Sequence, residues 1–248
     1  GNGISMFIFA GILANIPFDI KEVLSRILAG ELNWLHLLLF FAISVAIIAG
    51  VIFIQQGSRK IPVQYAKRVV GRKMYGGHST HIPLKVNQAG VIPVIFSISI
   101  LMMPITIAQF WPTGNAYGWL SSNFDQASVL YNVLNAVLIV AFTYFYTSVS
   151  FNPVDVSDNL KKNGGFVPGI RPGKPTTEYL ERTLYRITFA GGIFLALIAT
   201  IPNVIFALTD MKLSFGGTSI LIAVGVSLET YKQIEAHITM RHYQGFLK

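Results

Sequence analysis

Long apolar runs alternate with polar stretches along this chain, and their lengths decide which fold the sequence predicts. A helix needs about 20 mostly apolar residues to cross a bilayer. The first run is shorter and ends beside Pro17, but a tilted or glycine-containing helix can be lined by protein rather than lipid, so we count it as a span. The predicted spans cover 4–18, 35–54, 89–111, 129–151, 187–208 and 215–240. The pattern therefore predicts an all-α fold, a polytopic membrane helix bundle of about six transmembrane helices.

Basic residues gather in two long loops, 55–85 and 152–186. The first holds seven lysines and arginines and no acidic residue, and the second holds six basic and four acidic residues. Other connections are poor in basic residues, and one of them, 21–32, predicts a short amphipathic piece on the outer surface. The positive-inside rule then predicts that both long loops and the C-terminus lie in the cytosol. With six spans, the N-terminus of this piece is expected in the cytosol too.

Composition supports a membrane protein and argues against several activities. Only 12% of residues are charged, whereas soluble domains carry roughly 25%. The spans 35–54, 89–111, 129–151 and 187–208, and the apolar part of the last span, 215–228, hold no Asp, Glu, Lys or Arg. Their absence argues against a proton or sodium carrier. The chain has no cysteine and no phosphate-binding, metalloprotease or hydrolase motif. We therefore expect no enzyme activity, no cofactor and no metal site. A fragment of a secondary transporter for a small solute remains the alternative, and it would need convergent polar groups at mid-membrane.

Four stretches of the sequence carry a resemblance to a known family. They are "GNGISMFIFAGI" at the start, "STHIPLKVNQAGVIP" at 79–93, "FNPVDVSDNLKKNGGFVPGIRPG" at 151–173 and "FGGTSILI" at 215–222. Through them the chain resembles bacterial SecY, the channel subunit of the Sec translocon, essentially end to end. The resemblance implies helices five to ten of a ten-helix fold, so this piece would lack the first four helices, with the plug and half of the lateral gate.

The resemblance also implies a function and a location. The expected function is a passive protein-conducting channel in the bacterial plasma membrane, driven by the SecA ATPase or the ribosome. Such a channel moves unfolded secretory polypeptides across the membrane and membrane proteins laterally into it. The implied partners are the SecE and SecG subunits, the signal sequence, the substrate polypeptide, membrane lipid and the first four helices of the same SecY.

Two groups of residues fall where SecY has its pore ring and its lateral gate. The implied pore ring holds Ile8, Ile12, Ile95 and Ile222, although the aliphatic spacing by itself indicates only helix packing. A ring of branched aliphatic side chains can fit around an extended chain and still resist ions. The implied gate residues are Asn87, Val91 and Pro93, on or beside a span that Pro93 and Pro104 should bend. Asn87 could hydrogen-bond across a closed gate or cap its own helix, and the sequence leaves both open.

The two basic loops are expected to dock SecA or the ribosome. Basic side chains suit both partners, because rRNA is a polyanion and the motor offers acidic surface. Arg171, in "GIRPG", matches an arginine that the family needs for translocation, and Pro168 and Pro172 restrict the backbone beside it. The docking residues implied are Arg59, Lys60, Lys67, Arg68, Arg72, Lys73, Lys161, Lys162, Arg171 and Lys174.

Overall fold

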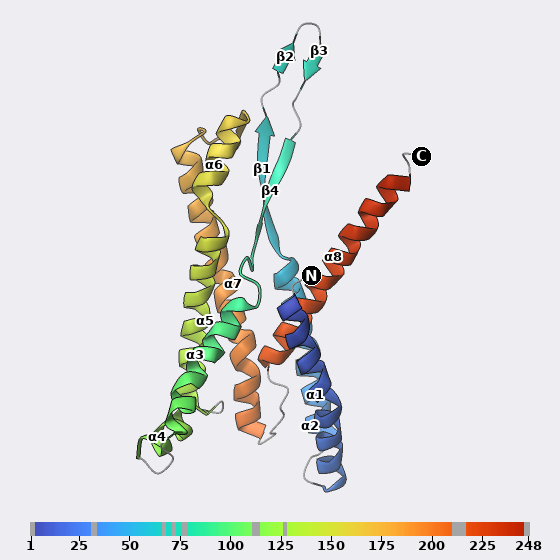
Figure 1. Cartoon of the computed structure of the whole chain (residues 1–248), viewed down its shortest axis with the longest axis vertical. Helices are drawn as coiled ribbons and strands as arrows, with labels where there is room; N and C mark the ends of the chain where they lie inside the picture. The colour runs from blue at the N-terminus through green and yellow to red at the C-terminus, as the bar shows by residue number, and fades with distance from the viewer. Residues whose placement is uncertain are drawn as a thin grey trace.

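A computed structural model of the chain describes residues 3–30, 34–65, 68–70, 73–75, 79–110, 115–125, 128–209 and 217–245. These residues form long helices and a β-hairpin (Figure 1). The helices are α1 (Gly3–Leu28), α2 (Trp34–Gln56), α3 (Ile92–Ala108), α4 (Asn115–Asn123), α5 (Val129–Ser150), α6 (Pro153–Lys162), α7 (Lys174–Thr209) and α8 (Gly217–Gly245). The strands are β1 (Ser58–Tyr65), β2 (Arg68–Val70), β3 (Lys73–Tyr75), β4 (Ser79–Lys85) and β5 (Gly165–Phe166).

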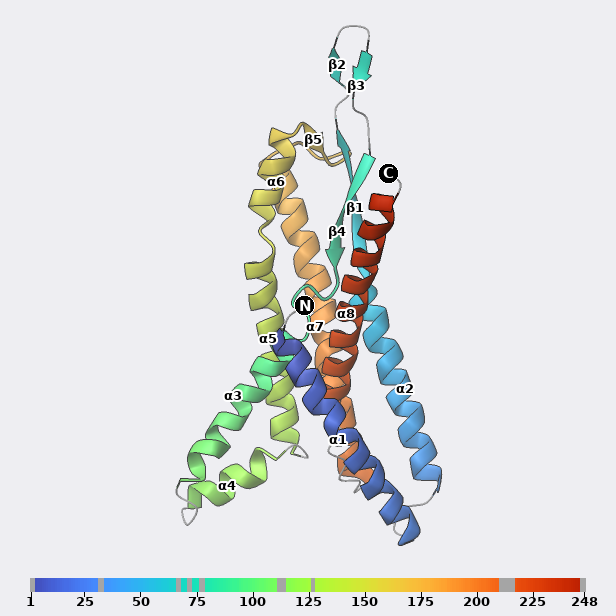
Figure 2. The ribbon, with the colours of Figure 1, turned by 45° about the vertical axis from the view of Figure 1, so that its right-hand side comes forward.

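The long helices form two groups that meet along α7 and α8. In one group α5 packs along α7 and α3 packs on α5, and in the other α1 and α2 both pack on α8 (Figures 1 and 2). A buried cluster joins the groups: Ile47 and Val51 of α2, Val94 of α3, Ile139 of α5, Leu195, Ala196, Ile198 and Ala199 of α7, and Ile220 and Leu221 of α8. The core therefore sits where the two groups converge.

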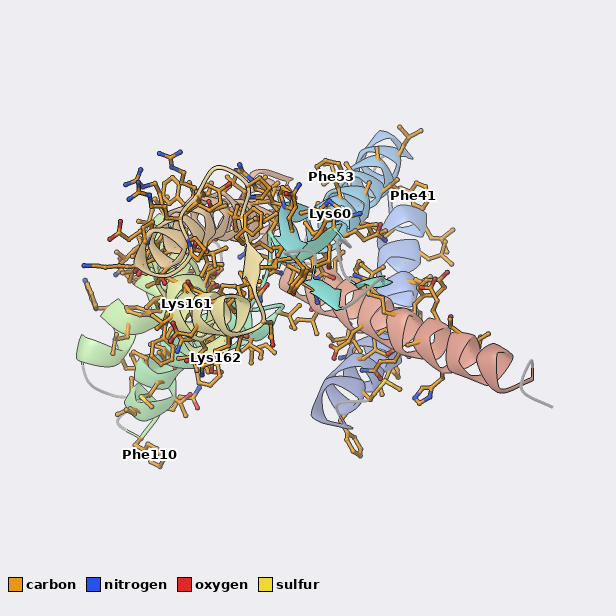
Figure 3. All side chains as sticks on the ribbon, turned by 90° about the horizontal axis from the view of Figure 1, so that it is seen from above. Phe41, Phe53, Lys60, Phe110, Lys161 and Lys162 are labelled. Carbon is orange, nitrogen blue, oxygen red and sulfur yellow. The ribbon has the colours of Figure 1, made fainter. Side chains whose placement is uncertain are left out.

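Much apolar side-chain surface remains on the outside of the bundle. Among the described residues, the helical stretches Val129–Lys162 and Lys174–Asn203 are long and apolar enough to cross a membrane, and Phe41–Gln56 and Ile92–Ala108 are shorter apolar helices. Only 28% and 44% of the most apolar windows of the two longer stretches are buried. Phe41, Phe53 and Phe110, which Figure 3 labels, are 70%, 78% and 77% exposed. Surface of this kind needs lipid or further protein to cover it.

The basic segment 55–85, expected as a loop, contains a β-hairpin. β1 pairs antiparallel with β4, β5 adds to β1, and β2 pairs with β3 farther along the hairpin. Ile61 and Leu84 of the hairpin pack with Val167, Leu180 and Leu184 in a second buried cluster. This cluster fixes the hairpin against the first turns of α7, so the hairpin is part of the folded body.

Several helix boundaries differ from those that the hydrophobic pattern predicted. α1 continues through Pro17 to Leu28 and takes in most of the expected amphipathic piece. A proline removes one backbone hydrogen bond, and membrane-type helices tolerate that loss. α7 begins at Lys174, because its first turns are amphipathic and pack against the hairpin cluster. Pro93 is the second residue of α3 and so costs that helix no hydrogen bond, which leaves Pro104 as the interior proline.

Candidate functional site

The segment from Val86 to Val91 connects the hairpin to α3, and neighbouring backbone holds it closely. The Val86 N–H donates to the Gly57 carbonyl oxygen at 2.9 Å. On the other side, a Cβ at Gly191 of α7 would lie 2.5 Å from the Val86 carbonyl oxygen. Only glycine permits that approach, since real Cβ contacts are longer. The start of α3 is therefore fixed between the end of α2 and the middle of α7.

Replacing Gly191 by alanine should destabilise the protein by about 1–3 kcal/mol, because the added methyl must displace backbone rather than a flexible side chain. Gly192→Ala is the matched control, since a Cβ there would meet its nearest atom, Thr143 Cβ, at an ordinary 3.6 Å. Thermal unfolding of the purified protein would compare the two variants. Equal melting temperatures for the two variants would mean that the connection tolerates displacement.

A polar pocket of about 340 Å³ opens beside this connection. Asn87, one of the implied gate residues, is 7% exposed there, and its Nδ2 donates to the Gly90 carbonyl oxygen at 3.0 Å. Within the described part of the chain, Asn87 Oδ1 and Gln88 Oε1 are buried without a hydrogen-bond partner. The pocket is lined by Gln55, Lys85, Asn87, Gln88, Ala89, Gly90, Val91, Ile92, Gly225, Leu228, Glu229 and Lys232. Asn87 thus closes a local turn through its amide nitrogen. Its amide oxygen has no hydrogen-bond partner within the described residues and could accept a hydrogen bond from another helix.

The four implied pore-ring residues lie on three helices. Ile12 of α1 and Ile95 of α3 are half-buried, and Ile222 of α8 is 8% exposed. The side chain of Ile8 lies outside the described residues, although its backbone belongs to α1. The structure brings α1 and α8 into direct contact, where Thr230 Oγ1 lies 3.7 Å from Met6 Sδ while its hydroxyl donates to the Val226 carbonyl oxygen of α8 at 2.8 Å.

α3 meets α8 close to the same level. A Cβ at Gly225 of α8 would lie 2.8 Å from Cγ1 of Val91, the implied gate residue that precedes α3. α1 and α3 run down from these contacts while α8 runs up through them (Figure 2). At 1.5 Å of rise per residue, Ile95 lies about 6 Å from Val91 along the axis of α3, and Ile222 lies about 5 Å from Gly225 along the axis of α8. The same count puts Ile12 about 9 Å from Met6 along α1 and Ile222 about 12 Å from Thr230 along α8.

Most of the implied docking residues gather at one end of the molecule. The hairpin, α6 and the C-terminal end of α8 all rise toward it (Figures 1 and 2). Figure 3 looks onto this end and labels Lys60 on the hairpin and Lys161 and Lys162 on α6. These three and Arg59, Arg171 and Lys174 are exposed. Lys67 and Arg72 lie outside the described residues, and Arg68 and Lys73 are described by backbone only, in β2 and β3.

The loop that carries Arg171 is held tightly by its backbone. Gly169 and Gly173 have φ angles of 81° and 99°, which L side chains rarely adopt. Thr176 Oγ1 donates to the Arg171 carbonyl oxygen at 2.8 Å, and Ser157 Oγ of α6 donates to the Gly173 carbonyl oxygen at 3.0 Å. The loop therefore presents an exposed arginine on a fixed main chain.

Sequence reasoning missed two polar contacts between the apolar helices. Ser97 Oγ of α3 donates to Asn135 Oδ1 of α5 at 2.6 Å. Asn203 Nδ2 of α7 donates to Asn132 Oδ1 of α5 at 3.2 Å. The available signal was the occurrence of two asparagines, Asn132 and Asn135, inside an apolar run, but nothing in the sequence shows which residue 38 or 71 positions away faces them.

Two curated relatives match this chain over its whole length. The protein translocase subunit SecY of Halalkalibacterium halodurans is 48% identical over 256 residues, which cover 100% of this chain and 60% of the relative. The subunit of the same name from Bacillus subtilis is 48% identical over 256 residues, with 59% of the relative covered. The chain thus spans about 60% of the length of these curated relatives.

Solved structures share the fold. A structure reported as that of a protein conducting channel matches with a TM-score of 0.61 at 20% identity, over 95% of this chain and 59% of that chain. A SecY structure, reported for a plug domain that stabilises the closed state of the translocation channel, matches with a TM-score of 0.60 at 20% identity. The match covers 95% of this chain and 60% of that chain. These confirm the prediction of a SecY-type helix bundle. A sequence model of the SecY family matches residues 1–231, and the chain therefore belongs to the SecY family of multi-pass membrane proteins.

Proposed function

We propose that this chain forms part of a protein-conducting channel of the Sec translocon. The rest of the channel wall comes from the portion of the relatives' length that it does not span. The channel moves unfolded secretory polypeptides across the bacterial plasma membrane and membrane proteins laterally into it. It performs no covalent chemistry, so the driving energy comes from a docked SecA motor or a translating ribosome.

The observation that carries the proposal is the register of α1, α3 and α8. Their contacts at Met6–Thr230 and Val91–Gly225 support a shared region for Ile12, Ile95 and Ile222, each of which follows one of these contacts by a short distance along its own helix. Ile8 lies one turn above Ile12 on α1 and belongs to the same ring in this proposal. Branched aliphatic side chains at one depth form a constriction that resists ions by narrowness and dewetting, yet yields to an extended polypeptide.

The gate lies at the start of α3. Asn87 and Val91 line the pocket there, and Pro93 is buried in the first turn of α3. The two buried amide oxygens, of Asn87 and Gln88, are suited to accept hydrogen bonds from a helix in the portion of the relatives that this chain does not span. A polar contact of this kind inside a membrane contributes about 0.6–1.7 kcal/mol, which is enough to bias a gate and small enough to be broken by a partner.

The basic end of the molecule faces the cytosol and docks the driving partner. The hairpin, α6 and the end of α8 rise on the same side, which supports a common location for both basic segments and the C-terminus. SecE, SecG and membrane lipid cover the exposed apolar surface of α2, α3, α5 and α7. A small-solute carrier would need polar groups that converge on a site at mid-membrane, whereas Ser97 pairs with Asn135 and Asn203 pairs with Asn132 across helix contacts.

A photocrosslinking experiment tests the function. The full-length protein would be reconstituted with its partner subunits, with a photoreactive side chain at Ile95 or Ile222 and, as a control, at the exposed Leu197 of α7. With a translocating polypeptide arrested in the channel, the first two positions should crosslink to it and Leu197 should crosslink to lipid or a partner subunit. Polypeptide crosslinks from all three positions, or from none, would contradict the proposed path.

A further inference from the structure

A second pocket, of about 220 Å³, lies where α5 gives way to α6, beside the first turns of α7 (Figure 1). It shares no residue with the pocket at the start of α3. α5 is apolar, whereas α6 carries aspartates and lysines, so the pocket lies at the boundary between the apolar helices and the basic end. Its lining residues are Tyr144, Thr147, Ser148, Phe151, Asn152, Pro153, Val154, Thr177, Glu181, Leu184, Tyr185 and Thr188.

The lining of this pocket suits a ligand with a positive charge. Glu181 of α7 is the only charged side chain among the lining residues, and it is exposed. The rings of Tyr144 and Tyr185 have centroids 5.9 Å apart and supply aromatic surface beside it. A carboxylate attracts a cation, and the faces of aromatic rings attract one too. The pocket therefore favours an ammonium group over an anion.

A buried hydroxyl in the lining adds a requirement for a hydrogen bond. Thr147 is 3% exposed, and its Oγ1 has no hydrogen-bond partner within the described residues. Its neighbours on α5 differ, because Thr143 Oγ1 donates to the Ile139 carbonyl oxygen and Ser148 Oγ to the Phe145 carbonyl oxygen, both at 2.7 Å. A buried polar group without a partner is costly. A primary ammonium has three N–H donors and could supply the partner, whereas a quaternary ammonium has none.

Exposed apolar surface continues from the pocket along both helices. α5 runs toward the basic end and α7 runs away from it (Figure 1). Phe189 and Ile193 follow Tyr185 by one and two helical turns on α7 and are 52% and 39% exposed. Val137 precedes Tyr144 by two turns on α5 and is 60% exposed. A ligand with a hydrocarbon chain would cover this surface, and a small soluble amine would not.

We propose that this pocket binds the headgroup of a phospholipid with a primary ammonium, such as phosphatidylethanolamine, in the leaflet next to the basic end. Glu181 and the two tyrosines hold the ammonium, and Thr147 Oγ1 accepts one of its N–H bonds. An acyl chain lies along Val137 and Phe189. This binding goes beyond the proposed channel function and requires only that the chain spans a membrane.

Photoreactive lipids test the site in the full-length protein, reconstituted with its partner subunits. The vesicles are phosphatidylglycerol with a minor fraction of phosphatidylethanolamine or phosphatidylcholine, each carrying the same photoreactive acyl chain. Crosslinks are mapped to residues 137–149 and 185–193. Phosphatidylethanolamine should crosslink there about two- to tenfold more than phosphatidylcholine, the factor that one net hydrogen bond is worth.

Thr147→Val should remove this preference for phosphatidylethanolamine, because it deletes the hydroxyl and nearly keeps the shape. Thermal stability in phosphatidylcholine vesicles should not fall, since the hydroxyl has no partner to lose within the described residues. Thr143→Val is the matched control: Thr143 is buried one turn away on α5 and does not line the pocket. That variant should keep the preference.

Glu181→Gln should lower the crosslinking of both lipids up to about fivefold, because both headgroups carry a positive charge and an accessible ion pair is worth that much. Glu178→Gln is the control, since Glu178 is exposed one turn away on α7 and outside the lining. It should leave both yields unchanged.

Four results would overturn the proposal. Three are equal crosslinking of the two lipids to the unaltered protein, equal losses in the Glu178 and Glu181 variants, and crosslinks from these segments to a partner subunit in place of lipid. The fourth is displacement of the lipid by excess soluble phosphoethanolamine, which would mean that the pocket takes a free headgroup. No translocating polypeptide is needed, so a failure of the channel function would leave this measurement intact.

Discussion

Arg171→Glu should abolish motor-driven protein export while the protein still folds, inserts and assembles. The side chain is exposed, and the substitution reverses a charge on a loop whose backbone is fixed by Thr176 and Ser157. A fixed loop loses little conformational entropy when it binds, so the arginine can contribute most of its interaction energy to docking. Removing one partner of a desolvated charge pair costs about 2–5 kcal/mol, or roughly 30- to several-thousandfold in affinity.

Two further variants separate docking from general electrostatics. Arg171→Lys keeps the charge but loses the planar fork of the guanidinium, so export should fall only in part. Arg182→Glu makes the same charge reversal at an exposed position in α7, away from the loop, and should leave export near normal. The measurement is ATP-driven translocation into vesicles, with binding of the motor measured in parallel. Normal export by Arg171→Glu, or an equal loss in Arg182→Glu, would show that the loop is not the docking point.

The membrane helices could be predicted from the sequence because apolar length is a local property. The hairpin could not, although Ile61 and Val63 alternate with exposed Pro62 and Gln64 as a half-buried strand requires. Proline normally argues against a strand. Here β5 pairs with β1 only at Gln64 and Tyr65, beyond Pro62, so this proline does not have to donate a hydrogen bond to that strand.

The presence or absence of a local sequence signal also decides which candidate sites could be predicted. The exposed position of Arg171 was predictable, because a run rich in glycine, proline and charge seldom becomes buried. The Ser97–Asn135 hydrogen bond was not predictable, because it joins residues 38 positions apart whose only local signature is a polar residue in an apolar run. Of the two roles left open for Asn87, the structure shows a local one, because its amide nitrogen donates to the Gly90 carbonyl oxygen. A hydrogen bond across the gate stays a prediction.

Ile222→Asn should make the closed channel leak ions. In the proposed constriction this side chain contributes to an apolar seal, and an amide there would bind water and lower the barrier to wetting. Burying an isoleucine side chain is worth about 1.5–3 kcal/mol, and each 1.36 kcal/mol changes a rate tenfold. Ion passage should therefore rise roughly ten- to hundredfold, and export of substrates with defective signal sequences should improve, because the closed state loses the same packing.

The controls follow from the surroundings of Ile222. Ile222→Leu keeps the seal apolar and should stay tight. Ile220→Asn tests a different property, because Ile220 belongs to the core cluster with Ile47 and Leu195. An amide there should lower thermal stability by about 2–5 kcal/mol, as other large losses of core packing do, without opening the pore. Planar-bilayer conductance of the complete complex decides the matter: a tight Ile222→Asn channel, or equal leaks from both asparagine variants, would mean that Ile222 does not line the pore.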